Sequence, residues 1–337
     1  MTTTAPDPAR ARFPGISSRA YEHPADRSAL VALRALSGFD TALRKLSGLF
    51  SERSVRLMFL STGVRAGDRQ FRHVYDLLRD AAYTLDLPEV PELYVVQNAN
   101  PRAMALGSDQ PFIVVTTGLV DLFDTDELRF VLGHEAGHVL SGHAVYRTML
   151  FLLASLASRA MWVPLGYLGL RAIVAALEEW HRKSELSADR AGLLVGQDRQ
   201  AGLRALMKLA GGSYVQEMDT EAFLEQAREY DAAGDVRDGA IKLLNLQGAT
   251  HPFAAPRAAQ LDKWGNSEDY RRIIDGEYPR REDDRGASIS EEIRNAARSY
   301  KDSMSETADP LVGVLRDLAD GAQSTGEKIF TRFNRRS

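Results

Sequence analysis

The sequence contains no cysteine among its 337 residues. Disulfide bonds and thiolate metal ligands are therefore excluded. Any metal ion must be held by histidine and carboxylate side chains, a donor set that suits zinc or a similar divalent ion. An excess of either charge is also missing. The formal net charge is only −4, and no block of cations interrupts the part expected to fold, so composition gives no argument for a nucleic-acid partner.

Long hydrophobic runs are missing as well. The first ten residues lack the apolar region of a signal peptide, which predicts that the protein is not secreted. The most apolar stretch, 144–178, holds the uncharged runs 148–158 and 160–170, separated by Arg159. Each run is shorter than the roughly 20 apolar residues that span a membrane. We therefore predict a packed helical hairpin at 144–178, with interfacial membrane contact as the second choice and a spanning pair as the third.

What the sequence does contain is enough apolar material for a core, since 44% of its residues are hydrophobic. Residues 1–27 are rich in Pro, Ala, Thr and Arg without periodicity, which predicts a flexible leader. We expect one folded domain at 28–275, with the apolar hairpin inserted in it, and a charged, weakly helical or disordered tail at 276–337. The basic end of that tail could contact an anionic membrane through Lys328, Arg332, Arg335 and Arg336.

The predicted fold class is α+β, mainly helical, with a small β-sheet. Helical spacing of apolar residues recurs through most of the chain, whereas 92–96, 102–106 and 112–116 have the composition of short strands. We nominate Ala103–Leu106 as an edge strand that pairs with an extended substrate backbone. A buried core strand is the equally open alternative at this position.

A His-Glu-x-x-His motif follows the predicted sheet. His134 and His138 are four residues apart on a helix, so they differ by about 40° around the axis and about 6 Å along it and can reach one metal ion. Glu135 projects beside that ion, where a carboxylate can take a proton from a water molecule. A capping-box pair, Asp124 and Glu127, predicts the start of this helix. Gly133 and Gly137 share a face, where another element could pack closely.

A later helical stretch carries carboxylates one turn apart. Glu185 can be the third metal ligand, and Asp189 can accept a hydrogen bond from a ligand imidazole and fix its tautomer. His181 is the alternative third ligand, with Glu178 and Glu179 as weaker candidates. We interpret His143, nine residues past His134, as supporting a ligand or the fold.

Three features together resemble one known family: the motif from His134 to His138, the Glu185 and Asp189 pair, and His251-Pro252 followed by Arg257. The sequence is similar to the gluzincin zinc proteases that include HtpX and the CAAX prenyl endopeptidases. The resemblance covers about 95–257 and implies a zincin-like catalytic core. It implies His134, His138 and Glu185 as zinc ligands, Glu135 as catalytic base and Asp189 as acceptor. It also makes His251, otherwise read as structural, a candidate for stabilising the oxyanion, and both readings stay open.

We therefore expect a zinc metalloendopeptidase with one Zn²⁺ per chain, acting on peptides or on unfolded or membrane-associated proteins. Integral members of the family carry spanning helices at the N-terminus and between the metal-binding helices, where this chain has only the interrupted hairpin. We expect a cytoplasmic protein, with at most peripheral contact at the inner face of the membrane through 148–170 or the basic end. The alternative is a non-catalytic, zinc-stabilised binding protein or a membrane-surface scaffold.

Overall fold

The computed structural model describes residues 10–35, 52–157, 167–232 and 254–286. The elements in chain order are η1 (Ser18–Ala20), α1 (Pro24–Ala35), α3 (Glu52–Thr62), β1 (Val64–Arg65), α4 (Arg72–Thr84), β2 (Glu92–Val96), β3 (Ala103–Leu106), β4 (Phe112–Thr116), α5 (Thr117–Leu122), α6 (Thr125–Leu140), α7 (Ala144–Ala157), α8 (Tyr167–Gly196), α9 (Arg199–Gly211), η2 (Val215–Glu217), α10 (Thr220–Ala232), α12 (Ala254–Gly265), α13 (Glu268–Ile274) and η3 (Arg281–Gly286). The α+β, mainly helical class predicted from the sequence is confirmed.

The four strands form one sheet in the order β1-β2-β4-β3. β2 pairs with β4 in parallel, whereas β1 and β3 pair antiparallel to their neighbours. All five residues of β4 are buried, as expected for the uncharged central run Phe112–Thr116. β3 lies at one edge of the sheet, where we placed the edge strand, and it begins at Ala103 rather than at residue 102.

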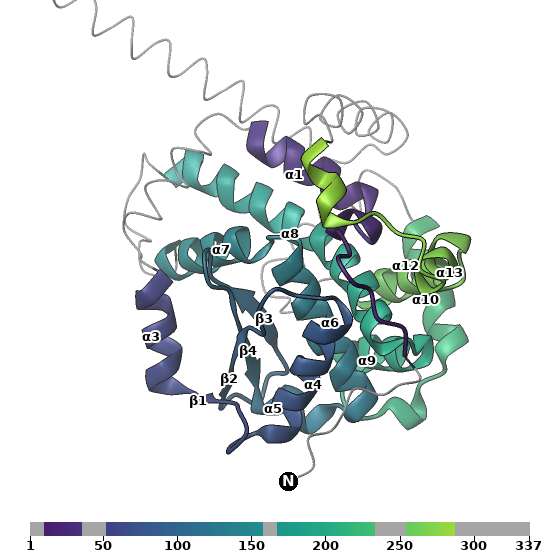
Figure 1. Cartoon of the computed structure of the whole chain (residues 1–337), viewed down its shortest axis with the longest axis horizontal. Helices are drawn as coiled ribbons and strands as arrows, with labels where there is room; N and C mark the ends of the chain where they lie inside the picture. Colours follow the sequence, from purple (N-terminus) through teal and green to yellow (C-terminus); the bar gives the residue numbers. More distant parts are fainter. Residues whose placement is uncertain (1–9, 36–51, 158–166, 233–253, 287–337) are drawn as a thin grey trace, which may run out of the picture.

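The two faces of the sheet bury different cores because alternate residues of a strand point to opposite sides. Val95 and Val115 pack into the main core with α4 and α6, whereas Tyr94 and Val114 pack on the other face against Phe59 of α3. Figure 1 shows α3 on one side of the strands and α4 and α6 on the other. The sheet is thus a middle layer that supports α6.

α6 lies in the middle of the protein and begins at the predicted capping box. The Asp124 side chain accepts hydrogen bonds from the backbone N–H groups of residues 126 and 127, and the Glu127 side chain accepts one from the backbone N–H of Asp124. α8 crosses α6 at the two glycines. A Cβ atom on Gly133 would lie 2.6 Å from Val195 Cβ, and one on Gly137 would lie 2.3 Å from Ala191 Cβ. The predicted close approach is therefore present, and it brings the two motif-bearing helices together.

The beginning of the described chain differs from the flexible leader predicted for 1–27. Phe13, Ile16 and Tyr21 are fully buried in the main core, and the Tyr21 hydroxyl donates a hydrogen bond to the carbonyl oxygen of Gly137 at the end of α6. These three apolar residues are few and stand among Pro, Ala, Thr and Arg residues, a composition that predicts no buried segment. The prediction is wrong for 10–27, and residues 1–9 lie outside the described part.

The predicted tail also begins too early. Ile16 forms an antiparallel bridge with Arg280, and the Ser17 hydroxyl donates to Asp284 in η3. Residues 276–286 therefore pack on the N-terminal segment, and the two segments hold each other against the helices. The predicted tail from 287 onward, including its basic end, lies outside the described residues.

The apolar stretch 144–178 spans α7 and the first part of α8, and 158–166 lie outside the described residues. Its buried side chains include Leu153 and Leu177, which form a second core cluster with Trp180 of α8 and Leu33 of α1. Within the described ranges, no helix combines the length and the apolar character needed to cross a membrane.

Candidate metal centre

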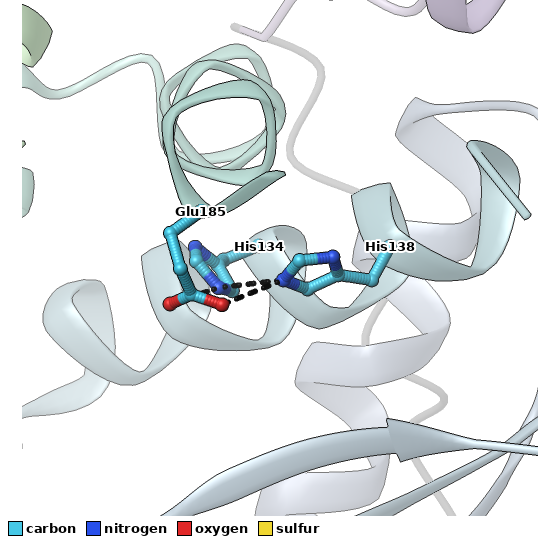
Figure 2. Close-up of side chains that lie close together, drawn as sticks. All are labelled: His134, His138 and Glu185. Atoms are coloured by element: carbon cyan, nitrogen blue, oxygen red, sulfur yellow. Dashed lines mark hydrogen bonds and ion pairs between the residues drawn. The ribbon is translucent and has the colours of Figure 1, made fainter. Parts of the chain in front are cut away.

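Three helices contribute the polar side chains of the candidate site. α6 supplies His134, Glu135 and His138, α8 supplies Glu185 and Asp189, and α12 supplies Arg257. Figure 2 shows the two imidazoles of α6 facing the Glu185 carboxylate across the contact between α6 and α8. All of these side chains are buried. The positions follow from the small residues at the helix crossing, because Gly133 and Gly137 permit the backbones to approach.

The distances among the candidate ligand atoms fit one divalent ion. His138 Nε2 lies 3.1 Å from His134 Nε2 and 3.2 Å from Glu185 Oε1, and His134 Nε2 lies 3.5 Å from Glu185 Oε2. Tetrahedral coordination at about 2.1 Å separates neighbouring ligand atoms by about 3.4 Å. Two imidazole nitrogens and one carboxylate group at these spacings are a suitable donor set for zinc.

The alternative third ligand is less well placed. Among the His, Asp and Glu residues that the structure describes, His134, His138 and Glu185 form the one group of three whose ligand atoms gather within 4.8 Å. His181 Nδ1 is 3.6 Å from Glu185 Oε1 and borders this group. Its buried Nδ1 has no hydrogen-bond partner in the part of the protein described.

Neighbouring charges keep the candidate carboxylates ionised. Burial alone would raise the pKa of Glu185, but Arg257 and His134 hold that pKa well below its usual range. Burial opposes ionisation of Asp189 in the same way, and Arg257 again lowers the pKa. Burial lowers the pKa of His138 well below its usual range, and Arg147 lowers it further. The His138 imidazole is therefore neutral, with a nitrogen lone pair free to bind a metal.

His134 has a different balance of effects. Burial lowers its pKa, but Glu185 and Asp189 outweigh burial and raise the pKa to about 9. Its Nδ1 lies 2.9 Å from Asp189 Oδ1, which leaves Nε2 facing Glu185. Asp189 therefore occupies the acceptor position proposed for it, and a cation bound by Nε2 would replace the proton that the two carboxylates attract.

Arg257 and Arg147 are charged residues whose places the sequence did not predict. Arg257 contacts both Asp189 and Glu185. Arg147 Nη1 lies 3.3 Å from Glu135 Oε2 and 3.8 Å from Glu185 Oε1. Arg147 carries the one formal charge in the α7 sequence, and a lone charge in an apolar helix signals a buried partner. Arg257 was part of the family resemblance, but the resemblance assigned it no role.

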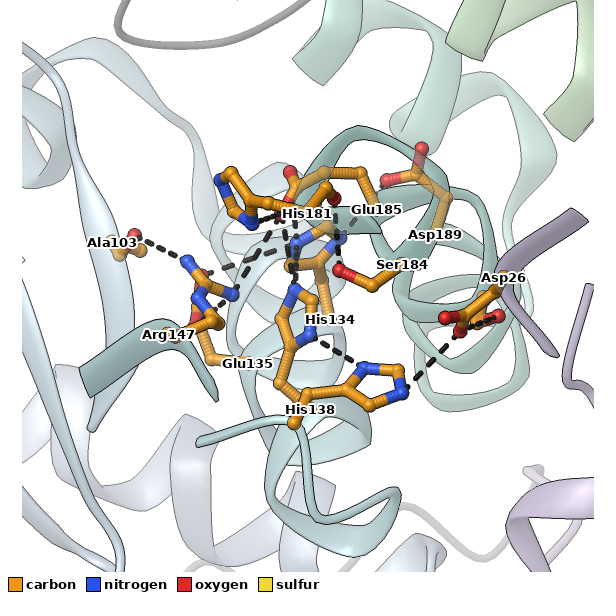
Figure 3. Close-up of polar contacts among 12 residues, drawn as sticks. Asp26, Ala103, His134, Glu135, His138, Arg147, His181, Ser184, Glu185 and Asp189 are labelled. Carbon is orange, nitrogen blue, oxygen red and sulfur yellow. Dashed lines mark hydrogen bonds and ion pairs between the residues drawn. The ribbon is translucent and has the colours of Figure 1, made fainter. Parts of the chain in front are cut away.

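Behind His138 lies a further row of polar side chains, drawn in Figure 3. His138 Nδ1 is 3.0 Å from His143 Nδ1, and His143 Nε2 is 3.3 Å from Asp26 Oδ2. His143 thus supports a candidate ligand, one of the two roles left open by the sequence. Asp26 falls in the predicted leader and was missed. His251, the candidate for the oxyanion, lies outside the described residues.

Sequence comparison relates the chain to known proteins. A sequence model of peptidase family M48 matches residues 68–265. The plastoglobule-localized metallopeptidase 48 of Arabidopsis thaliana is 35% identical over 78% of this chain and 77% of its own length. Protease HtpX of Legionella pneumophila (strain Corby) is 29% identical over 56% of this chain and 75% of its own length. An HtpX homolog of Streptococcus gordonii is also 29% identical, over 32% of this chain and 42% of its own length.

No solved structure shows significant similarity to the chain. The family match nevertheless covers more than half of the sequence and contains the His-Glu-x-x-His motif, Glu185, Asp189 and Arg257. The resemblance inferred from the motifs is thereby confirmed, and the family implies a metal-dependent peptidase. On the matched region and its buried cluster of metal-binding groups, the chain belongs to peptidase family M48.

Proposed function

We propose that the protein is a zinc-dependent endopeptidase in which His134, His138 and Glu185 hold the metal and Glu135 is the general base. The observation that carries the proposal is the convergence of two Nε2 atoms and one carboxylate in a buried group, with Glu135 on the same helix and 4.0 Å from His134 Nε2. A purely structural metal site would need no such additional carboxylate.

Zinc bound by these residues would polarise the scissile carbonyl and activate a water molecule for attack. Glu135 would accept the proton of that water and donate it to the departing amine. Arg147 contacts Glu135 Oε2 and would hold the carboxylate in position for both transfers. Asp189 would fix the tautomer of His134 through Nδ1, and His251 remains our candidate for the oxyanion.

The edge strand supports a peptide as substrate. Among the described strands, β3 pairs with β4 alone, so its other edge can pair with an extended chain. Arg147 Nη2 lies 3.5 Å from the Ala103 carbonyl oxygen and also reaches the Glu135 side chain through Nη1. A peptide added to β3 would therefore lie beside the base. Main-chain pairing recognises an extended backbone and depends little on the side chains. It therefore favours unfolded proteins and peptides as the substrate class.

Membrane contact through 148–170 remains a proposal of lower rank. Residues 149–153 of α7, whose side chains the structure describes, are all apolar, but Leu153 is buried in a cluster with Leu33 of α1 rather than exposed. Liposome flotation of the full chain tests this contact independently of catalysis.

The decisive test is Glu135→Gln. The substitution removes the base and leaves the three metal-binding side chains unchanged, so we expect stoichiometric zinc with cleavage of casein reduced by at least a hundredfold. Asp126→Asn is the matched control, because Asp126 is an exposed acid on the same helix with a side chain 60% accessible. Zinc-loaded wild-type protein that cleaves no unfolded protein would favour the non-catalytic alternative, and full activity in Glu135→Gln would exclude this mechanism.

A further inference from the structure

We propose that His143 and Asp26 form a relay that orients the metal-binding imidazole of His138, and that helix α1 is therefore part of the metal centre. The inference rests on the proposed metal-binding role of His138. Its basis is a continuous row of buried polar atoms from α6 through the α6–α7 turn to α1 and α8 (Figure 3).

The row fixes the hydrogen position on each imidazole. If His138 binds a metal through Nε2, its proton is on Nδ1, and that N–H can donate only to an acceptor. The facing atom is His143 Nδ1 at 3.0 Å, which must then carry the lone pair. The proton of neutral His143 is consequently on Nε2, and this nitrogen faces Asp26 Oδ2 at 3.3 Å. Each hydrogen-bond donor in the row thus faces an acceptor on the next residue.

The far end of the row is tied to the same helix that supplies Glu185. The Ser187 hydroxyl donates to Asp26 Oδ2 at 2.6 Å and accepts a hydrogen bond from the backbone N–H of His23 at 2.9 Å. The Trp180 ring meets His143 edge-on, with ring centroids 5.3 Å apart. Ser187 thus ties the start of α1 to α8, and Trp180 of α8 packs on the His143 ring, so that the Asp26 carboxylate lies opposite His143.

The two metal-binding imidazoles are consequently supported from opposite sides. Asp189 on α8 lies behind His134, whereas His143 lies behind His138. The match to the peptidase family, residues 68–265, includes Asp189 and His143 but not Asp26. Groups behind metal ligands typically change metal affinity by 10-fold to 100-fold when they are removed. The segment before the matched region therefore completes the support of one ligand.

The test measures the zinc dissociation constant of the full chain by competition with a chromogenic chelator. His143→Leu keeps most of the volume but removes the acceptor, so we expect zinc binding to weaken by 10-fold to 100-fold. His143→Asn places a carbonyl oxygen near the position of Nδ1, so its affinity should stay within about threefold of wild type. Asp26→Leu should weaken binding by about tenfold, because His143 then loses the group that fixes its tautomer.

Leu33→Ala is the matched structural control. Leu33 is a buried residue of the same helix α1, and its truncation should lower the melting temperature without changing zinc affinity. Unchanged affinity in His143→Leu or in Asp26→Leu would overturn the relay. Equal weakening in His143→Asn and His143→Leu, or in Leu33→Ala, would also overturn it, since affinity would then follow stability. The zinc measurement requires no cleavage, so it remains decisive even if Glu135→Gln refutes the endopeptidase.

Discussion

Arg257 on α12 holds Asp189 on α8 through two hydrogen bonds, from Nε at 2.8 Å and from Nη2 at 2.6 Å. Its third nitrogen, Nη1, lies 3.0 Å from Glu185 Oε2. One guanidinium thus compensates both the carboxylate placed to bind the metal and the carboxylate behind His134. The planar donor set of arginine suits this task because it can address both acids in a fixed geometry.

Arg257→Met should destabilise the metal-free protein by about 3 to 5 kcal/mol, because two buried carboxylates lose their cation. The free energy of unfolding of Arg257→Lys should lie between those of Arg257→Met and wild type, since lysine keeps the positive charge but not the planar set of N–H donors. The free energy of unfolding in urea, measured with a chelator present, checks this order. Arg228→Met is the control, because Arg228 pairs with Glu221 at an exposed position. Equal stability of Arg257→Met and wild type would contradict the role assigned to Arg257.

Gly137→Ala should separate the two metal-binding helices. The new Cβ atom would lie 2.3 Å from Ala191 Cβ, and neither atom can rotate away. We expect a loss of about 1 to 3 kcal/mol in the free energy of unfolding, together with weaker zinc binding, since α8 carries Glu185. Gly67→Ala is the control, because a Cβ there meets no atom within 4 Å. Wild-type zinc affinity in Gly137→Ala would show that the helix spacing does not set the site.

Asp26 predicts a particular dependence of stability on pH. Burial raises its pKa from 3.8 to about 7, against the lowering effect of Ser187 and Trp180. The folded state therefore holds this proton more tightly than the unfolded state does. The stabilisation is complete below pH 4 and is lost as the pH rises through 7. Burial lowers the pKa of the neighbouring His143 to about 3, so His143 stays neutral over this range.

Asp26→Asn should remove that dependence, because asparagine is neutral at every pH. Relative to wild type, the variant should gain up to about 4 kcal/mol between pH 4 and pH 8, at about 1.4 kcal/mol per pKa unit. Urea unfolding of both proteins across this range in a chelator measures the difference. Leu33→Ala changes the same helix without a titrating group, so its difference from wild type should be constant. A constant difference for Asp26→Asn would refute the assignment.

Local signals in the sequence were sufficient for the elements that carry the site. The Asp124 and Glu127 cap, the two glycines of α6 and the apolar composition of β2 and β4 each depend on residues close in the chain. The structure agrees at all of these positions. The grouping of His134, His138 and Glu185 followed from helical spacing combined with the resemblance.

The supporting roles of Asp26 and Arg257 could not be predicted in this way because their partners are distant in sequence. Asp26 meets Ser187 across 161 positions, and Arg257 meets Asp189 across 68. No periodic pattern marks either residue before the helices are packed. The same reason accounts for residues 10–27, where Phe13 and Tyr21 are buried by contacts with elements far along the chain.

The crossing of α6 and α8 at Gly133 and Gly137 has a consequence for how such proteins diversify. Because the two halves of the metal site are held by direct contact between the helices, the chain between Leu153 and Ala176 does not set their separation. Lengthening a connection adds little closure entropy, which grows only with the logarithm of its length. The connector could therefore change in length or polarity during evolution without moving the metal-binding side chains apart.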